Sequence, residues 1–272
     1  MNKAIIFDIQ RNSFVDGPGI RTTVFFKGCN LKCKWCHNPE SQSPKPQIMF
    51  YKDKCTDCGR CKGMTEKDTE FVCFNGAKQI CGREYTVDEV FHAVQKDRLF
   101  YEASGGGVTF SGGECMLQID FLCEILKKCK SNEIHTAVDT AGFVPWESFE
   151  RILPYTDLFL YDMKAFNNIV HKEFVGVSNE LIFNNLEALL TRKVNVLIRI
   201  PVIPTVNDSV EEMKSIRHFL TPYKLPAVEL LPYHKMGEHK YRALGMKATP
   251  FPVPSKEKME ELNEIFKDSI HK

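Results

Sequence analysis

The sequence lacks the features of a chain that is exported, inserted into a membrane or bound to nucleic acid. It has no basic, apolar and small-residue order of a signal peptide, and no apolar run near the ~18 residues that span a bilayer. Its 36 Lys and Arg residues are matched by 35 Asp and Glu, a net charge of +1, which gives no general attraction to nucleic acid or to an anionic membrane. We therefore expect a cytoplasmic protein with neither as its partner.

Internal repeats and low-complexity tracts are also absent, which argues against solenoid and propeller architectures. The glycine-rich stretch GGGVTFSGGE at residues 105–114 does not fit G-x-G-x-x-G, so a dinucleotide-binding fold gains no support from it. With 272 residues and 43% hydrophobic content, the chain is long enough for one principal domain that carries a small appendage.

Cysteine, in contrast, is abundant. The chain has 11 cysteines, and seven of them fall between residues 29 and 73. In a reducing compartment an odd and clustered set indicates metal ligation more than disulfides. Cys123 and Cys129 lie within a helical pattern and are interpreted as small buried hydrophobic residues.

Short β-rich apolar runs alternate with amphipathic helical patterns along most of the chain, which predicts an α/β fold of βα units around a parallel sheet. We expect strands at residues 20–28, 107–111, 134–140, 157–162, 194–202 and 227–233. We expect helices at residues 86–100, 115–130, 146–153, 179–192, 208–220 and 255–270. Capping-box spacing marks two helix starts, Thr86 with Glu89 and Asp208 with Glu211.

Residues 42–85 interrupt this alternation. They contain Pro44, Pro46 and five cysteines, and they show no sustained periodicity. We expect an irregular subdomain that needs a metal to order it.

Polar or glycine-rich residues follow or end each of the six expected strands. In chain order they read GCNLKCKWC, SGGE, DTAG, YDMK, IRIP and LPYH. In parallel sheets and barrels, ligands bind where the carboxyl ends of the strands converge. The pattern therefore predicts one site built from all six strand ends.

The first cysteine group, Cys29, Cys33 and Cys36, has the spacing C-x3-C-x2-C on the loop after the first expected strand. Three thiolates can ligate three irons of a [4Fe-4S] cluster and leave the fourth iron open to bind a substrate. The alternative is a zinc site completed by His37. Because His37 directly follows Cys36, a joint tetrahedron is awkward in so short a loop.

The second group has the C-x2-C-x2-C spacing of ferredoxin cluster loops and consists of Cys55, Cys58 and Cys61. Eleven residues then separate Cys61 from Cys73, the expected fourth ligand, and Phe74 stands where the bacterial ferredoxin run has proline. Cys81 is the alternative fourth ligand. A structural zinc knuckle is the alternative to an auxiliary iron–sulfur cluster.

Taken in order, these motifs resemble the glycyl-radical-enzyme activating enzymes, a branch of the radical S-adenosylmethionine superfamily. The resemblance is carried by the three-cysteine loop, SGGE, DTAG, YDMK, SFVDGPGIRTTVFFKGC (residues 13–29) and LLPYHKMGEHKY (residues 230–241). It implies a partial (β/α)6 TIM-type barrel formed by residues 1–51 and 85–272. It also implies a ferredoxin-like iron–sulfur insert at residues 52–84.

The resemblance implies an oxidoreductase of anaerobic metabolism. Such an enzyme reductively cleaves S-adenosylmethionine to a 5'-deoxyadenosyl radical, which abstracts a Cα hydrogen from a glycine of a partner glycyl-radical enzyme. A flavodoxin- or ferredoxin-type protein would donate the electron. The insert disfavours the plain pyruvate formate-lyase activases as models, and the sequence does not name the partner. The same loop also suits a radical S-adenosylmethionine enzyme that acts on a small molecule.

The resemblance also implies a role for each matching residue around the catalytic cluster, which Cys29, Cys33 and Cys36 would hold. The cofactor's amino group would face Gly112, Gly113 and Glu114. Its carboxylate would be neutralised by Lys164 and Arg199, its ribose bound by His234, and its adenine bordered by Trp35 and His37.

Three further sites are implied in the same way. A monovalent cation would be gathered by Asp139, Thr140 and Asp162. The target glycine loop would dock at the segment that contains Asp16. One auxiliary [4Fe-4S] cluster would be held by Cys55, Cys58, Cys61 and Cys73. The chain departs from the family pattern at Cys115, where the family usually has proline after Gly-Gly-Glu.

Overall fold

The structure, a computed structural model, describes residues 2–68, 70–223 and 226–269. Its centre is an eight-stranded sheet in the order β10-β9-β8-β7-β6-β2-β1-β5. Six neighbouring strands are parallel: β2 (Arg21–Phe26), β6 (Gly107–Gly112), β7 (His135–Thr140), β8 (Leu158–Asp162), β9 (Val196–Val202) and β10 (Ala227–Pro232). These are the six strands expected from the sequence, and the mostly parallel α/β barrel sheet is confirmed.

Two antiparallel strands extend this sheet and were not predicted. β1 (Lys3–Ser13) pairs with β2 on one side and with β5 (Arg83–Thr86) on the other. β1 is partly exposed along much of its length and has two register shifts against β2, so its apolar residues do not alternate regularly. This irregular pattern hides the strand from a periodicity argument.

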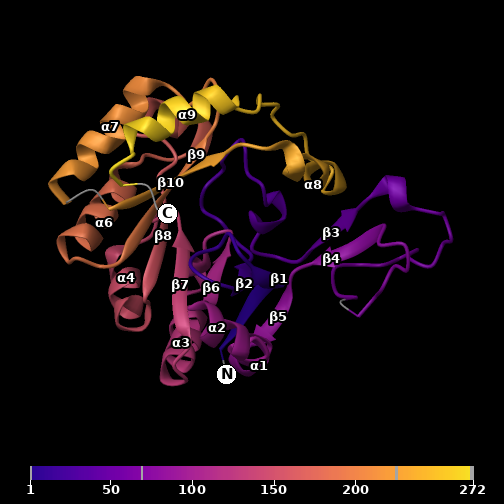
Figure 1. The fold of residues 1–272 in the computed structure, drawn as a ribbon. Helices are drawn as coiled ribbons and strands as arrows, with labels where there is room; N and C mark the ends of the chain where they lie inside the picture. Colours follow the sequence, from indigo (N-terminus) through magenta and orange to yellow (C-terminus); the bar gives the residue numbers. More distant parts are fainter. Residues whose placement is uncertain (1, 69, 224–225, 270–272) are drawn as a thin grey trace.

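The helices lie on the outer side of the sheet, as Figure 1 shows for α3, α4, α6 and α7. Seven of the helices in the described residues correspond to expected ones: α1 (Val87–Gln95), α2 (Arg98–Ser104), α3 (Ile119–Ser131), α4 (Trp146–Ile152), α6 (Glu180–Thr191), α7 (Val210–Leu220) and α9 (Lys256–Ile265). Two short ones were not expected, α5 (Asn168–Val175) and α8 (Glu238–Ala243). Six 3-10 turns complete the described chain: η1 (Pro39–Ser41), η2 (Lys52–Lys54), η3 (Cys115–Gln118), η4 (Leu153–Tyr155), η5 (Thr221–Tyr223) and η6 (Lys235–Gly237).

One of the two predicted capping boxes is confirmed. The Thr86 hydroxyl accepts from the Glu89 amide, and the Glu89 carboxylate accepts from the Thr86 amide at 2.7 Å. The prediction of Asp208 as a cap is wrong by one residue. Ser209 caps α7 instead, because the Asp208 carboxylate accepts from the amide of Thr205 within the preceding turn.

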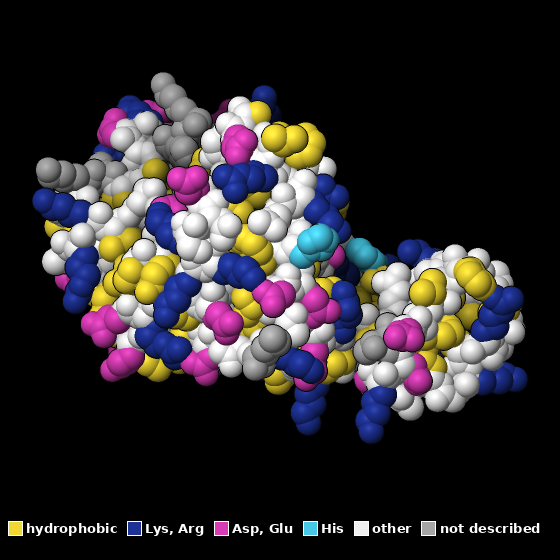
Figure 2. Space-filling model, turned by 90° about the horizontal axis from the view of Figure 1, so that it is seen from below, with side chains coloured by type: hydrophobic (Ala, Val, Ile, Leu, Met, Phe, Trp, Pro, Cys, Tyr) yellow, Lys and Arg dark blue, Asp and Glu magenta, His cyan; other side chains and the backbone are white. Residues whose placement is uncertain are grey.

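The segment expected to be irregular has more structure than predicted. Strands β3 (Gln47–Phe50) and β4 (Lys78–Cys81) pair as a short antiparallel ribbon. Turns and η2 occupy the described residues between the two strands. This ribbon projects away from the barrel in Figure 1, and Figure 2 shows the segment as a separate lobe joined to the body by a narrow neck.

Within the described residues, no helix has the length and apolar character needed to cross a bilayer. The parallel strands other than the edge strand β10 are mostly buried, as β6 and β9 show, because side chains cover both faces of the sheet. Between sheet and helices, the Phe149 ring is fully buried and lies 5.8 Å from the Phe159 ring and 6.4 Å from the Tyr161 ring.

Replacing Phe149 with alanine should lower the free energy of unfolding by about 3–5 kcal/mol, because it removes a buried ring and leaves a cavity behind α4. Urea denaturation of the metal-free protein, followed by circular dichroism, measures this loss. Phe74→Ala is the matched control, since the Phe74 side chain is 81% exposed. We expect it to stay within about 0.5 kcal/mol of the unsubstituted protein. Equal losses in both variants would show that Phe149 is not part of the core.

Candidate functional site

The parallel strands bring the predicted site residues to one end of the sheet. The three-cysteine loop follows β2, and the Gly-Gly-Glu loop begins at the end of the neighbouring β6. Asp139 and Thr140 end β7, and Asp162 ends β8 opposite Arg199 of β9. His234 follows β10. Convergence at the carboxyl ends, which the sequence pattern predicted, is therefore observed.

The three-cysteine loop is held by backbone hydrogen bonds and by an apolar anchor. The Gly28 amide donates to the Ser41 carbonyl at 2.7 Å, and the Lys32 amide donates to the Val175 carbonyl at 2.8 Å. Leu31 and Trp35 are buried in a small cluster that also contains Val175, Ile203, Tyr233 and Phe251. The loop thus turns its apolar residues into the protein while the thiols alternate with them in sequence.

The three thiols are partly buried and lie close enough to affect one another. Burial is the main cause that raises the pKa of Cys29 to about 11 and of Cys33 to about 12, and it also raises the pKa of Cys36. The charge of Lys164 opposes this rise at all three. A bound cation would stabilise the thiolate form of thiols in such a place, and this fits a set of metal-cluster ligands.

Two glycines place the end of β6 directly against the start of the cysteine loop. Gly112 has φ +116°, and a Cβ at this residue would lie 2.3 Å from the Phe26 nitrogen. A Cβ at Gly113 would lie 2.2 Å from the Gly28 carbonyl oxygen. The amides of Gly113 and Glu114 donate to the carbonyls of Phe26 and Gly28, each at 2.8 Å. Glycine is required at both positions because backbone meets backbone there.

The carboxylate of Glu114 points inward and has several partners within the protein. It accepts from the Thr140 hydroxyl at 2.8 and 2.9 Å, from the Ala141 amide at 3.1 Å and from the Met116 amide at 3.2 Å. Burial is the largest cause that raises the pKa of Glu114 to about 7, and the Thr140 bond opposes it. The side chains of Glu114 and Thr140 therefore join the loops after β6 and β7 to each other.

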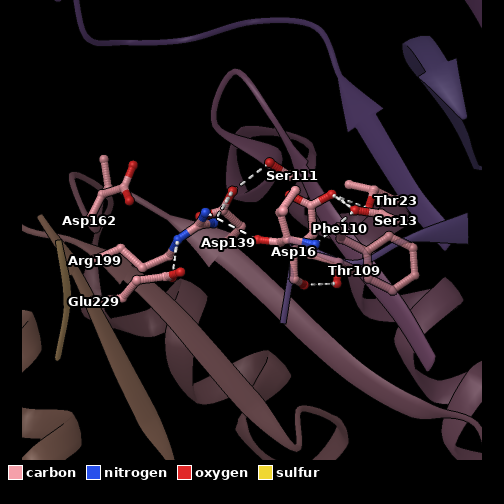
Figure 3. A network of polar contacts seen from close by, with 12 residues as sticks. Ser13, Asp16, Thr23, Thr109, Phe110, Ser111, Asp139, Asp162, Arg199 and Glu229 are labelled. Atoms are coloured by element: carbon pink, nitrogen blue, oxygen red, sulfur yellow. Dashed lines mark hydrogen bonds and ion pairs between the residues drawn. The ribbon is translucent and has the colours of Figure 1, made fainter. Parts of the chain in front are cut away.

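A network of charged and hydroxyl groups lies across the strands and is shown in Figure 3. The Asp16 carboxylate accepts from the hydroxyls of Ser13 at 2.5 Å and Thr23 at 2.7 Å. The Ser111 hydroxyl donates to Asp139 at 2.6 Å. The carboxylates of Asp16 and Asp139, which are far apart in sequence, thus lie in one region on either side of Arg199, which contacts Asp139 and the backbone carbonyl of Val15.

Arg199 is 9% exposed and contacts two carboxylates and the Asp16 segment. Its Nη1 lies 3.8 Å from Asp139 Oδ2, its Nε lies 3.3 Å from Glu229 Oε2, and its Nη2 donates to the Val15 carbonyl at 3.3 Å. Burial and the nearby Asp162 raise the pKa of Asp139 to about 6, against the opposing charge of Arg199.

Lys164 is the second buried cation of the site. Its Nζ donates to Asp162 Oδ2 at 2.9 Å. Burial alone would lower the pKa of Lys164, but the charge of Asp162 and the nearby Cys33 thiol outweigh it, so the pKa is raised. The ammonium therefore stays charged beside the cysteine loop.

The remaining predicted cofactor residues lie at the edge of this region. The His37 ring stacks on the His234 ring at a centroid distance of 3.9 Å, and His37 Nε2 lies 2.8 Å from the His234 carbonyl oxygen. Trp35 is 7% exposed and meets Phe251 edge-on at 6.3 Å. These three predicted residues line one narrow pocket together with Tyr233 and Tyr241.

The projecting lobe contains an open cavity of about 650 Å³, and all four cysteines expected to bind an auxiliary cluster line it: Cys55, Cys58, Cys61 and Cys73. Backbone amides of Lys78 and Ala77, followed by those of Asn75 and Gly76, lower the pKa of the Cys73 thiol. Cys81 is not among the lining residues. It lies on β4, buried against Met49 and Ala243, and burial raises its pKa to about 11.

In the described part of the chain, no three His, Cys, Asp or Glu side chains are close enough to coordinate a single metal ion. In a four-iron cluster the cysteine ligands bind separate irons, so they need not converge on one point. Both cysteine groups meet this looser requirement, because each gathers its thiols on one loop or around one cavity.

The sequence did not identify the residues that orient or pair with the charged side chains of the site. Ser13 and Thr23 orient Asp16, Ser111 orients Asp139, and Glu229 pairs with Arg199. Ser111 directly precedes the two glycines, and Glu229 lies in the middle of an apolar strand, which is an unusual place for a charged residue unless it has a partner. Glu229, the one charged residue in AVELLPY, was therefore the feature of the sequence that could have indicated a charged partner on a neighbouring strand.

Glu114 should make stability depend on pH. Its pKa is raised from 4.5 to about 7 on folding, so its contribution to stability is fully present below about pH 4.5 and is lost as the pH rises through 7. In Glu114→Gln, the free energy of unfolding of the metal-free protein should therefore decline less steeply between these values. Denaturant titrations at several pH values measure the slope. Glu260→Gln, on the exposed face of α9, is the control, and equal slopes in the two variants would contradict the assignment.

Comparison with known sequences shows the family of this chain. The radical SAM superfamily model matches residues 23–219. The trans-4-hydroxy-L-proline dehydratase activating enzyme of Clostridioides difficile is 43% identical, over 97% of this chain and 96% of that protein. The choline trimethylamine-lyase activating enzyme of Oleidesulfovibrio alaskensis is 41% identical, over 89% of this chain and 87% of that protein.

Solved structures agree on the fold. A domain of a pyruvate-formate lyase-activating enzyme from Bacteroides vulgatus is 34% identical with a TM-score of 0.52, covering 60% of this chain and 94% of that one. A radical SAM methyltransferase from Sphaerobacter thermophilus, 18% identical with a TM-score of 0.58, covers 92% of this chain and 64% of its own. The chain belongs to the radical SAM superfamily and, within it, to the activating enzymes of glycyl-radical enzymes.

Proposed function

We propose that this activating enzyme holds its catalytic [4Fe-4S] cluster with Cys29, Cys33 and Cys36 and binds S-adenosylmethionine across the carboxyl ends of β2 to β10. The observation that carries the proposal is the buried ammonium of Lys164 beside the cysteine thiols. A buried cation next to a three-thiol loop suits a site where a carboxylate must bind close to the metal.

The chemistry that the cluster supplies when bound is one-electron reduction of the sulfonium, which yields methionine and the 5'-deoxyadenosyl radical that takes a Cα hydrogen from the partner's glycine. The protein's own part is to bind, orient and shield. Lys164 and Arg199 would neutralise the cofactor carboxylate. An amino group needs acceptors, so Gly112 and Gly113 would offer it their carbonyl oxygens, since the Gly113 amide is already donated within the chain.

Four roles follow for the remaining predicted residues. His234 would bind the ribose, and Trp35 and His37 would border the adenine, supported by the closeness of the three residues at the edge of the site. Asp139 and Asp162 would gather a monovalent cation, and Thr140 would contribute through its backbone, because its hydroxyl is bonded to Glu114. The inward carboxylate of Glu114 would position the loops rather than touch the cofactor.

The target glycine would approach the segment around Asp16. Phe14 and Val15 beside it are each 71% exposed, so the segment offers an apolar surface next to an oriented carboxylate. We propose that the lobe of residues 52–84 is a ferredoxin-like unit whose four cysteines hold one auxiliary [4Fe-4S] cluster. A flavodoxin or ferredoxin would supply the electron.

The overall proposal is tested by mixing the reduced, iron-loaded protein with S-adenosylmethionine and a candidate partner. Trans-4-hydroxy-L-proline dehydratase is the first candidate, because its activating enzyme is 43% identical to this chain. A glycyl radical signal in the partner, seen by electron paramagnetic resonance, supports activation of that enzyme. Absence of the signal with this and other glycyl-radical enzymes, despite cofactor cleavage, would refute the assigned partner class.

Cys33→Ala should abolish reductive cleavage of S-adenosylmethionine, because the catalytic cluster loses a ligand. The measurement is 5'-deoxyadenosine formed under dithionite, quantified by chromatography. Cys123→Ala is the control, since Cys123 is a buried thiol of α3 that bonds to the Arg151 carbonyl away from the site. Unchanged product in Cys33→Ala would overturn the ligand assignment.

Cys73→Ser should remove about four irons per chain, whereas Cys81→Ser should remove none. The reason is that Cys73 lines the lobe's cavity with the other three cysteines, and Cys81 lies against the barrel side of the ribbon. Iron and sulfide analysis of anaerobically loaded protein distinguishes the two. The opposite outcome would make Cys81 the fourth ligand, and a zinc-only preparation would end the iron–sulfur interpretation of the lobe.

A further inference from the structure

A set of polar side chains joins four separate segments around the cysteine loop. We call it the polar seam, and its members are Lys27, Asn38, Glu40, Gln47, Lys240 and Tyr241. Lys27 precedes Cys29 by two residues, and Asn38 follows Cys36 by two. The seam therefore contacts the chain at both ends of the three-cysteine loop. None of its members is given a contact with the cofactor or the substrate above, although Tyr241 also lines the narrow pocket beside His37 and His234.

The centre of the seam is the Glu40 carboxylate. Glu40 is 4% exposed, and its Oε1 accepts from Lys240 Nζ at 2.6 Å. Its Oε2 is buried and has no hydrogen-bond partner, so Lys240 supplies the hydrogen bond that this carboxylate receives from a side chain in the described structure. The same ammonium donates to Asn38 Oδ1 at 2.8 Å. One lysine of α8 thus holds two residues of the cysteine loop.

Tyr241, the next residue of α8, holds the third cysteine itself. Its hydroxyl donates to the backbone carbonyl of Cys36 at 3.0 Å, and its ring is 7% exposed. Lys240 and Tyr241 therefore fix three positions within the five residues from Cys36 to Glu40. Since the Cys36 side chain is attached to this backbone, the direction of its thiol depends on these bonds.

The other side of the seam reaches the base of the projecting lobe. The Lys27 ammonium is 1% exposed and donates to the Glu40 carbonyl at 2.7 Å and to Gln47 Oε1 of β3 at 3.1 Å. Met49 and Cys81 of the ribbon pack against Ala243 of α8. Helix α8 thus stands between the cysteine loop and the lobe and contacts both.

We propose that Lys240 and Tyr241 are positioning residues for the catalytic cluster. From α8 they fix the Cys36 end of the ligand loop and keep it at a constant position relative to the lobe. The inference rests on the proposed function in one respect, that Cys36 is a cluster ligand. Loss of Lys240 leaves the Glu40 carboxylate buried without the ammonium that donates a hydrogen bond to it, which favours movement of the loop to return that charge to water.

The first experiment uses metal-free protein and needs no enzymatic activity. Hydrogen exchange with mass spectrometry follows the amides of Ser41 and Gln42, which donate to Asn38 and Pro39 within this turn. In Lys240→Met we expect their exchange to be faster by about tenfold or more, as a local opening becomes easier, while β6 to β9 are unchanged. Lys240→Arg keeps a cation at this position, so exchange in that variant should stay as slow as in the unsubstituted protein.

Arg242→Met is the matched control, because Arg242 is an exposed cation of the same helix that makes no hydrogen bond to the cysteine loop. It should exchange like the unsubstituted protein. Equal exchange in Lys240→Met and Arg242→Met would overturn the role of Lys240. If Lys240→Met fails to fold, as judged by circular dichroism, Tyr241→Phe decides the question, because it removes a single hydroxyl from the same contact.

The second experiment uses iron-loaded protein. In Tyr241→Phe and Lys240→Met we expect an altered electron paramagnetic resonance spectrum of the reduced cluster and a KM for S-adenosylmethionine raised about threefold or more, with folding retained. Tyr223→Phe, which loses a surface hydroxyl bond to Glu187, should leave both unchanged. An unaltered spectrum and KM in both seam variants would refute the proposal.

Failure of the proposed function is distinguishable from failure of this inference. If the unsubstituted loaded protein showed no change in its spectrum on adding S-adenosylmethionine, the cluster assignment would fall. The exchange rates of the metal-free variants would still report whether α8 positions the loop.

Discussion

The site depends on one contact between backbones, where the end of β6 meets the start of the cysteine loop after β2. The amides of Gly113 and Glu114 donate to the carbonyls of Phe26 and Gly28, so the parallel ladder continues one step past the last paired residues. A Cβ at Gly112 or Gly113 would push the two segments apart. This contact sets the distance between the cysteine loop and every other strand end, because the remaining strands follow in order from β6.

Charge is the second constraint, and it acts against burial. Asp139 and Asp162 lie near each other at the ends of adjacent strands, and each carboxylate costs free energy when it leaves water. Arg199 and Lys164 offset that cost, and they come from the neighbouring strand and from the residues just after β8. The result is a region with both signs of charge held a few ångströms apart. Such a region suits a ligand that carries an ammonium and a carboxylate, as an amino acid group does.

Most of the barrel could be predicted from the sequence because parallel strands are buried on both faces and appear as continuous apolar runs, as at residues 158–161. The strand ends could be predicted because polar residues such as Asp162 stand out against those runs. β1 could not, since its register shifts break the alternation, and neither could α8, whose six residues are too few for a periodic pattern. The inward turn of Glu114 also escaped, because a side chain's direction in a loop leaves no trace in spacing.

The spacing of the sequence does not distinguish Cys73 from Cys81 as the fourth ligand of the auxiliary cluster, whereas their positions in the structure differ. Both cysteines follow Cys61 after a long gap, and a loop of that length can bring either one back to Cys55, Cys58 and Cys61. What separates them is the β3–β4 ribbon, which takes Cys81 into the packed base while the turn at residues 73–78 leaves Cys73 at the cavity among backbone amides. The same ribbon carries Gln47 to Lys27, next to the catalytic loop. Two short strands that the sequence did not reveal thus determine which cysteine lines the cavity of the lobe. They also determine how the lobe is joined to the site.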